Sequence, residues 1–533
     1  MKRVCVLFFL AIVLAACANT PVTHDNNQQS EVNMDENINV STPIEPEVTP
    51  APVPTPIPIP EPEIEPLVLS APGAGFDFSD PEAPQFREAS VHDPSVFRVG
   101  DTFYVIGSHM AMASTTDFIQ WTQISRYVNE ENPLMYSLAD FQEAFDWART
   151  TTFWAGDVQQ MPDGRFFMYY CNCEGSMPLA NIGLAISDSP TGPFMNQGIF
   201  LRSGMLGTSE DGRPYNANIH PNAIDPHAFF DSQGVFRMVY GSFSGGIFIL
   251  DMDVETGLPL PGQGYGTHLM GGNHSRIEGP YMLFSPDTGY YYLFTSFGGL
   301  GAHEGYNMRV ARSRHPHGPF FDARSNDMRD VRGPRGSFFD DRAIEPYGTK
   351  IMGSYWFRRE PGEPGRATGY RSPGHNSAYF DAETGRYYLI FHTRFTEGNA
   401  HQIRVHEMFL NEDGWFVVSP FRYDGAPQRT FLPEHVPGSW KLINHGQEIN
   451  YDPNMSTTVN LNADGTITGP KTGYWRLEED GQTFNMTIDG VDYNGRLLRS
   501  FASDHRTWVM SFTAMSNEGI ALWGAGVALQ END

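Results

Sequence analysis

The chain has 533 residues, 40% of them hydrophobic, which is enough for two folded domains plus tails. Its 63 acidic and 35 basic residues give a formal charge of −28, which argues against nucleic acid and anionic membrane surfaces as partners and favours a neutral substrate. Phe, Tyr and Trp make up 13% of the chain, beside 53 Gly and 40 Pro. This mixture indicates short strands, tight turns and aromatic platforms for sugar rings, although any all-β protein has a similar composition.

The first 17 residues have the pattern of an export signal. Lys2 and Arg3 precede an apolar run over residues 4–14, which ends in Leu-Ala-Ala-Cys at Cys17. This resembles a bacterial lipoprotein signal peptide over residues 1–17, with Cys17 as the site of lipidation. A membrane-spanning helix is the alternative, but the run is shorter than the ~20 apolar residues that a bilayer requires. We therefore expect an extracellular protein, lipid-anchored to the bacterial cell membrane or cell surface.

Residues 18–70 follow as a segment rich in Asn, Glu, Thr and Pro, which cannot build a hydrophobic core. We expect a disordered Pro-rich linker that spaces the folded body from its anchor. Beyond it only Cys171 and Cys173 remain, on the same face of an expected strand. That geometry is poor for a disulfide and two thiols are too few for a zinc site, so we expect buried strand cysteines.

Between residues 75 and 428 one pattern recurs five times: a polar residue, a short strand, a Gly turn and a second, aromatic strand. The copies begin at His92-Asp93, Gly156-Asp157, Ile224-Asp225, Ile277-Glu278 and Gly374-His375. About 70 residues per unit suits four strands plus loops, the size of a propeller blade. The sequence therefore predicts an all-β fold, with a five-bladed β-propeller catalytic domain over 75–428. Alternating runs separated by Asp-Gly turns over residues 432–533 predict a small antiparallel β-barrel as an accessory domain.

In a propeller the innermost strands line a central channel, so equivalent positions of successive repeats meet around one axis. The repeats bring together four acids and one imidazole: Asp93, Asp157, Asp225, Glu278 and His375. Each acid alone is an ordinary turn or surface residue. Crowded carboxylates, however, are costly unless they serve a function, and glycoside hydrolysis needs one protonated and one ionised carboxyl group. The cluster therefore predicts an enzyme that cleaves polysaccharide.

The motifs around these acids are similar to those of glycoside hydrolase family 43. They are His92-Asp93-Pro94, Trp154-Ala-Gly-Asp157, Ala223-Ile-Asp225-Pro and Ile277-Glu278-Gly-Pro. The resemblance implies a five-bladed propeller and an inverting mechanism. In it Asp93 is the general base, Glu278 the general acid, and Asp225 the residue that tunes the pKa and orientation of the acid.

The motifs Ser372-Pro-Gly-His375-Asn-Ser and Phe391-His-Thr-Arg-Phe395, together with the C-terminal segment, resemble the larger bacterial endo-α-1,5-L-arabinanases of that family. This implies endo-hydrolysis of arabinan or arabino-oligosaccharides, with one mostly water-coordinated calcium ion held by His375 on the propeller axis. From residue type alone, a neutral imidazole hydrogen-bonded within the channel is the favoured explanation of His375, and only the resemblance points to calcium. A monomer is expected.

Substrate binding is expected at Trp154, Asp157 and Ser242, of which Trp154 and Ser242 could equally be packing residues. Gly156 departs from the proline that family members often have before this aspartate, which leaves the role of Asp157 open. Exo-acting α-L-arabinofuranosidase or β-xylosidase activity is the nearest alternative, since the acids do not separate these enzymes. A non-catalytic glycan-binding lipoprotein is a further alternative, disfavoured because all three acids are present.

Overall fold

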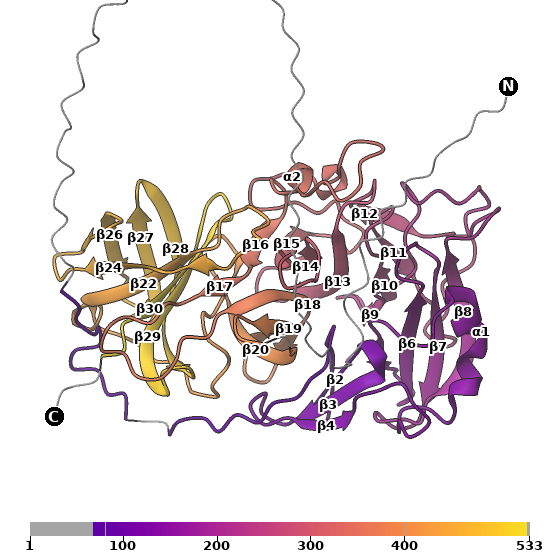
Figure 1. Ribbon diagram of the computed structural model, residues 1–533, viewed down its shortest axis with the longest axis horizontal. Coiled ribbons are helices and arrows are strands. Elements are labelled where there is room, and N and C mark those ends of the chain that lie inside the picture. Colours follow the sequence, from indigo (N-terminus) through magenta and orange to yellow (C-terminus); the bar gives the residue numbers. More distant parts are fainter. Residues whose placement is uncertain (1–67, 80–81, 399, 530–533) are drawn as a thin grey trace, which may run out of the picture. The chain divides into compact units, whose positions relative to one another are not determined.

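The computed structural model describes residues 68–79, 82–398 and 400–529. The predicted signal peptide, with Cys17, and nearly all of the predicted linker lie outside the described residues. Within the described part no helix is long and apolar enough to span a membrane. The regular secondary structure of the described chain is almost entirely β-strand (Figure 1).

Five antiparallel sheets follow one another along the chain as propeller blades, as predicted (Figure 1). The first has β1 (Ser95–Val99), β2 (Thr102–Gly107), β3 (Ala111–Thr115) and β4 (Thr122–Ser125), and the second has β5 (Asp157–Gln160), β6 (Phe166–Cys173), β7 (Ala180–Ser187) and β8 (Met195–Ser203). The third has β9 (His227–Phe230), β10 (Phe236–Tyr240), β11 (Ile247–Asp251) and β12 (Thr267–Met270), and the fourth has β13 (Ile277–Ser285), β14 (Tyr290–Phe297), β15 (Asn307–Ser313) and β16 (Thr349–Met352). The fifth has β18 (Tyr370–Asp381), β19 (Arg386–Phe395), β20 (Gln402–Leu410) and β21 (Phe416–Val418).

Short helices occupy connections between these strands. They are η1 (Ser108–Met110), η2 (Leu138–Phe141), α1 (Gln142–Ala148), η3 (Met328–Asp330), α2 (Asp341–Ile344) and η4 (Pro433–His435). The middle strands of the blades are buried on both faces because neighbouring blades pack against each other. Strand β6 shows this most fully, with all eight residues buried. Its Cys171 and Cys173 are both buried free thiols, as the sequence predicts.

The C-terminal strands close into an eight-stranded barrel, which confirms the predicted second architecture. Its strands are β22 (Gly438–Asn444), β24 (Thr457–Leu461), β25 (Thr466–Thr468), β26 (Gly473–Leu477), β27 (Thr483–Ile488), β28 (Val491–Ala502), β29 (Thr507–Ser516) and β30 (Ala521–Gly526). Strand β27 alternates buried and half-buried residues, as expected when one face lines the barrel core. Pairing of β22 with β30 completes the ring.

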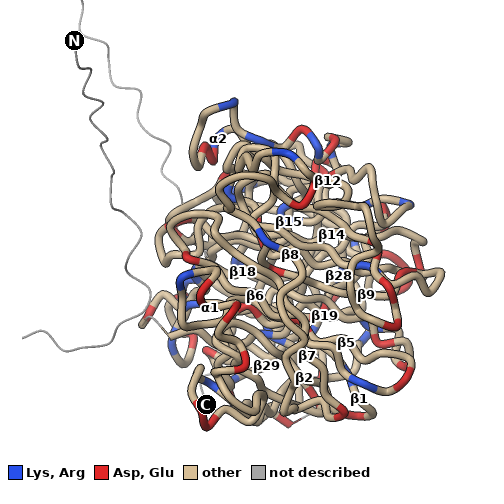
Figure 2. The backbone as a smooth tube through the Cα atoms, turned by 90° about the vertical axis from the view of Figure 1, so that its right-hand side faces the viewer, with Lys and Arg blue, Asp and Glu red and all other residues tan. Residues whose placement is uncertain are grey.

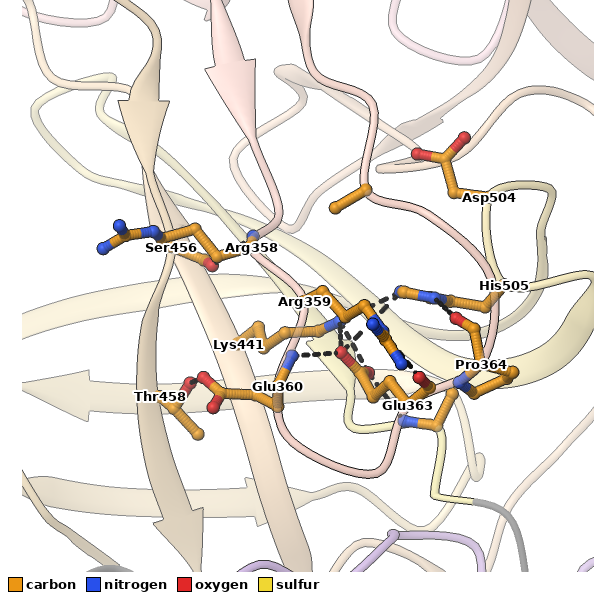
Figure 3. Close-up of polar contacts among 12 residues, drawn as sticks. Arg358, Arg359, Glu360, Glu363, Pro364, Lys441, Ser456, Thr458, Asp504 and His505 are labelled. Carbon is orange, nitrogen blue, oxygen red and sulfur yellow. Dashed lines mark hydrogen bonds and ion pairs between the residues drawn. The ribbon is translucent and has the colours of Figure 1, made fainter.

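The barrel and the fifth blade share contacts that the sequence pattern does not reveal. Strand β23 (Asn454–Met455) pairs in parallel with β17 (Tyr355–Trp356) at the edge of the fifth sheet. In the loop that follows β17, Glu363 is fully buried and forms an ion pair with Lys441 of β22, at 2.7 Å from Nζ to Oε1. His505 lies against the same pair (Figure 3). Buried charges persist only when paired in this way.

Charged residues are scattered over the tube in Figure 2, with basic positions interspersed among acidic ones. Such a mixed distribution differs from the continuous basic stripe of a nucleic-acid-binding face.

Candidate active site

The site is built on the inner strands, at residues with an unusual backbone. Asp93 and Asp225, just before β1 and β9, have positive φ angles of 57° and 55°, and His375, within β18, has a φ of 45°. Such conformations cost about 1–3 kcal/mol each for residues with side chains and cluster at functional sites. In the fourth blade Gly279 takes the same conformation, with φ 60°. All four residues line one pocket near the axis.

This geometry corrects one detail of the repeat alignment. Gly279, and not Glu278, is the fourth-blade counterpart of Asp93 and Asp225, because each of the three precedes a proline and has positive φ. The pairing of β13 with β14 shifts register between Glu278 and Tyr281. A bulge of this kind re-aims a side chain, and here it accompanies the displacement of the acid by one position.

The Asp93 carboxylate is surrounded by hydrogen-bond donors and imidazoles. The Ser108 hydroxyl donates to Oδ2 at 2.5 Å, and Nδ1 of His92 lies 2.7 Å from the same oxygen. Nδ1 of His375 lies 3.2 Å from the other oxygen, Oδ1. Burial alone would raise the pKa of Asp93, but His92, His375 and His392 outweigh it and hold the pKa well below the usual range. Asp93 is therefore ionised and able to accept a proton.

Glu278 has the opposite electrostatic setting. Its side chain is buried, the Tyr306 hydroxyl donates to Oε1 at 2.8 Å, and the Ser242 hydroxyl donates to Oε2 at 2.9 Å. Burial raises the pKa of Glu278 to about 7 against these two hydrogen bonds, and the negative charge of Asp93 adds to the increase. At neutral pH this carboxyl group can therefore hold a proton and release it to a substrate.

Asp225 is the third buried carboxyl group of the site. Its Oδ2 accepts a hydrogen bond of 3.1 Å from the backbone N–H of Gly279, directly after the acid. Burial, followed by the charges of Glu278 and Asp93, raises the pKa of Asp225 well above the usual range. Neighbouring buried carboxyl groups cannot all ionise, so Asp225 and Glu278 titrate as a coupled pair.

The remaining acid of the predicted cluster, Asp157, is committed to contacts between blades. The Ser95 hydroxyl bonds to one carboxylate oxygen and the Ala228 N–H donates to the other at 2.7 Å. These partners belong to the first and third blades, so Asp157 ties three adjacent blades together. With both oxygens occupied by protein donors, the geometry favours a structural role over the predicted sugar contact.

The other two predicted sugar contacts also have protein partners. Ser242 points to the acid, as described above, so its hydroxyl orients Glu278. Trp154 is half-buried and packs against the core between the second and third blades, with its ring 3.5 Å from the position that a Cβ of Gly175 would take. A stacking role for Trp154 stays a prediction.

His375 lies beside the base and beside Gly279, the residue that follows the acid. Its backbone N–H donates to the Ser296 hydroxyl at 2.7 Å, and its ring lies 3.1 Å from where a Cβ on Gly279 would be. Burial lowers the pKa of His375, and the charge of Asp93 opposes this shift. Next to it, Asn376 is buried and lines the same pocket, and neither polar atom of its amide has a hydrogen-bond partner.

Sequence reasoning missed the residues that support the two catalytic candidates. Tyr306 comes from the loop before β15 and Ser108 from η1, where no repeat pattern marks them. His392 lies on a middle strand, β19, and accepts a hydrogen bond of 3.1 Å from the backbone N–H of Asp93. The structure explains Gly374 of the fifth repeat, because a Cβ there would come within 2.1 Å of the Tyr306 ring.

Comparison with known proteins places this site in a family. The model described as glycosyl hydrolases family 43 matches residues 86–341, and the one described as a C-terminal lipocalin-like domain matches residues 420–524. Extracellular endo-α-(1→5)-L-arabinanase 2 of Bacillus subtilis is 52% identical over 446 residues, which cover 83% of this chain and 94% of that protein. The chain belongs to glycosyl hydrolase family 43.

Further relatives of this family 43 enzyme agree in sequence and in fold. The extracellular endo-α-(1→5)-L-arabinanase of Thermotoga petrophila is 45% identical, over 85% of this chain and 97% of that protein. The crystal structure of the Thermotoga petrophila endo-1,5-α-L-arabinanase superposes with a TM-score of 0.79, covering 84% of this chain and all (100%) of that chain. The family 43 YxiA protein of Bacillus licheniformis gives a TM-score of 0.80 at 50% identity, covering 83% and 99% of the two chains. The protein is thus a glycoside hydrolase.

Proposed function

We propose that this enzyme hydrolyses α-1,5-L-arabinofuranosidic linkages within arabinan, with inversion of configuration. The substrate is supported by the two relatives named as endo-arabinanases, over nearly the full length of each. The mechanism is supported by one observation above the others: two buried carboxyl groups in one site have pKa values displaced in opposite directions, Asp93 downward and Glu278 upward to about 7.

In the proposed reaction Asp93 removes a proton from water as the water attacks the anomeric carbon. Glu278 donates its proton to the oxygen of the leaving sugar. Inverting enzymes hold these groups ~6.5–9.5 Å apart so that a water molecule fits beside the sugar. The charge of Glu278 helps to raise the pKa of Asp225, so the two carboxyl groups share protons, and Asp225 fixes the backbone after the acid through Gly279.

Calcium is supported as a cofactor by the lining of the axial pocket. Asp93, Asp225, His375 and Asn376 all face this pocket, and the Asn376 amide oxygen has no partner. Calcium prefers oxygen ligands, so carboxylates, a free amide oxygen and water suit it, with His375 as the nitrogen donor. The bound ion would supply positive charge that favours ionised carboxylates nearby. These residues therefore fit the ion.

The location of the enzyme is also part of the proposal. Both close relatives are named extracellular, which supports export of this chain. Anchoring through a lipid on Cys17 is supported by the signal pattern of residues 1–17. A Cys17→Ala variant should be released from the cell envelope, whereas the wild type should remain bound and carry a lipid detectable by mass spectrometry.

Digestion of linear, debranched arabinan with analysis of product sizes tests the function. Endo action predicts a ladder of oligosaccharides from the first minutes. Early release of a single small product would instead support the exo-acting alternative. The Glu278→Gln variant should keep its fold and lose turnover; full activity in this variant would exclude Glu278 as the acid, and turnover by the wild type excludes the binding-only alternative.

A further inference from the structure

Three histidine side chains meet beside the proposed base, at the junction of the first and fifth blades. His92 precedes β1, His392 lies on β19, and His401 stands directly before β20. One ring nitrogen from each lies within 4.8 Å of the other two. The ring centroid of His92 lies 4.1 Å from that of His392 and 4.5 Å from that of His401. Among the described residues this is the cluster best suited to a metal.

The hydrogen bonds show which nitrogens are free. Nδ1 of His92 is taken by Asp93 Oδ2 at 2.7 Å, and Nδ1 of His392 faces the Asp93 backbone N–H at 3.1 Å. The Nε2 atoms of both rings are therefore the nitrogens left to bind a metal. Nε2 of His392, whose side chain is 1% exposed, has no hydrogen-bond partner, and neither has Nε2 of His401. Buried polar atoms without partners are rare in proteins and call for an explanation, such as an ion.

We propose that His92, His392 and His401 bind a divalent transition metal such as Zn²⁺ through their Nε2 atoms. Three imidazole nitrogens are a donor set for Zn²⁺, Ni²⁺ or Cu²⁺, whereas calcium prefers oxygen ligands, so this all-nitrogen site differs from the axial one. Zn–N bonds of ~2.0–2.1 Å place tetrahedral ligand nitrogens about 3.4 Å apart. The nitrogens lie within 4.8 Å of one another, so binding requires the three rings to move closer together. His92 and His401 are half-buried, which leaves an approach from solvent.

Binding at this site changes the surroundings of the base. A metal on Nε2 of His92 leaves the proton on Nδ1, where it bonds to Asp93, so carboxylate, histidine and metal form a connected series. On His392 the proton moves from Nε2 to Nδ1, which then turns from the Asp93 N–H toward Asp93 Oδ1, 3.5 Å away. Both changes and the added positive charge make Asp93 a weaker base. The metal should therefore inhibit turnover. This consequence rests on the proposed function, whereas the binding of the metal is independent of it.

Local charges neither exclude the cation nor attract it strongly. Burial, then His92 and then the Arg394 guanidinium lower the pKa of His401, so these groups oppose a further positive charge there. The Asp93 carboxylate acts in the opposite sense on the same imidazole. The site also joins the two ends of the propeller, because the Ile403 N–H donates to Ala89 O at 3.2 Å beside it. A bound metal should therefore raise the thermal stability of the ring.

Titration of the full chain with ZnCl₂ alone, in buffer containing calcium, tests the proposal. Wild type should bind one zinc ion, shown by calorimetry and by an anomalous diffraction peak between the three histidines. His401→Gln should weaken this binding at least tenfold and abolish the zinc-dependent rise in melting temperature. His315→Gln, which alters an exposed histidine, should behave as wild type.

Equal affinity of wild type and His401→Gln would overturn the proposal, as would an anomalous peak at His375 alone or an absence of zinc binding by the wild type. These outcomes are independent of arabinan hydrolysis. Failure of the metal site therefore remains distinct from failure of the proposed function.

Discussion

Removing the hydroxyl of Tyr306 should shift the pH range of activity upward. In Tyr306→Phe the ionised form of Glu278 loses the 2.8 Å hydrogen bond to Oε1, while the ring still fills the space above Gly374. A hydrogen bond to a charged group exceeds one to a neutral group by about 1–1.5 kcal/mol, which corresponds to about one pKa unit. Activity requires protonated Glu278, which in the wild type is lost as pH rises through about 7. The basic limb of kcat should therefore move up by about one pH unit in the variant.

The measurement is kcat on linear arabinan from pH 5 to 9 for wild type, Tyr306→Phe and a matched control. Tyr240→Phe is that control, because the Tyr240 hydroxyl is equally buried but donates to a backbone carbonyl, that of Tyr265, at 2.7 Å. It should lose similar stability and leave the basic limb in place. A basic limb that stays unchanged in Tyr306→Phe, or moves down, would refute the reasoning.

Three further changes test other parts of the structure. Ser108→Ala removes a 2.5 Å hydrogen bond to ionised Asp93, so its pKa rises and the acidic limb of kcat moves to higher pH; an unmoved limb contradicts this. Glu363→Gln leaves Lys441 buried without its counter-charge and should lower the free energy of unfolding by about 3–5 kcal/mol in urea titration, where a loss below about 1 kcal/mol argues against the pair. Gly374→Ala should displace the Tyr306 ring and reduce kcat at least tenfold; wild-type kcat would show that the loop adjusts freely.

Much of the fold could be predicted because a propeller repeats its local pattern. Each blade has an inner strand that follows a polar residue and a second strand rich in aromatic residues, and such periodicity is visible in one sequence. The parallel pairing of β17 with β23 was not predictable, since each has only two residues and they lie about a hundred positions apart. The same holds for Glu363 and Lys441, whose attraction depends on burial that sequence alone does not show.

The candidate site was predictable to the extent that it follows the repeat. Asp93 and Asp225 stand just before their inner strands, His375 lies within its own, and all three line one pocket. Glu278 was identified through its motif, although its exact register was missed because a bulge displaces it. Asp157 follows the repeat equally well and yet bonds to neighbouring blades, so position in the repeat does not by itself assign a role. The donors to the carboxyl groups come from loops and helical turns, where no periodic signal exists.

The central claim is that an ionised Asp93 activates water while a protonated Glu278 protonates the leaving group. Proton NMR of the first products from linear arabinan tests it most directly, because the anomeric signals are read before mutarotation. We expect new reducing ends in the β configuration, from attack by water on the face opposite the α-linkage. Products that first appear as α-anomers would indicate retention through a covalent intermediate and would contradict the roles assigned to both carboxyl groups.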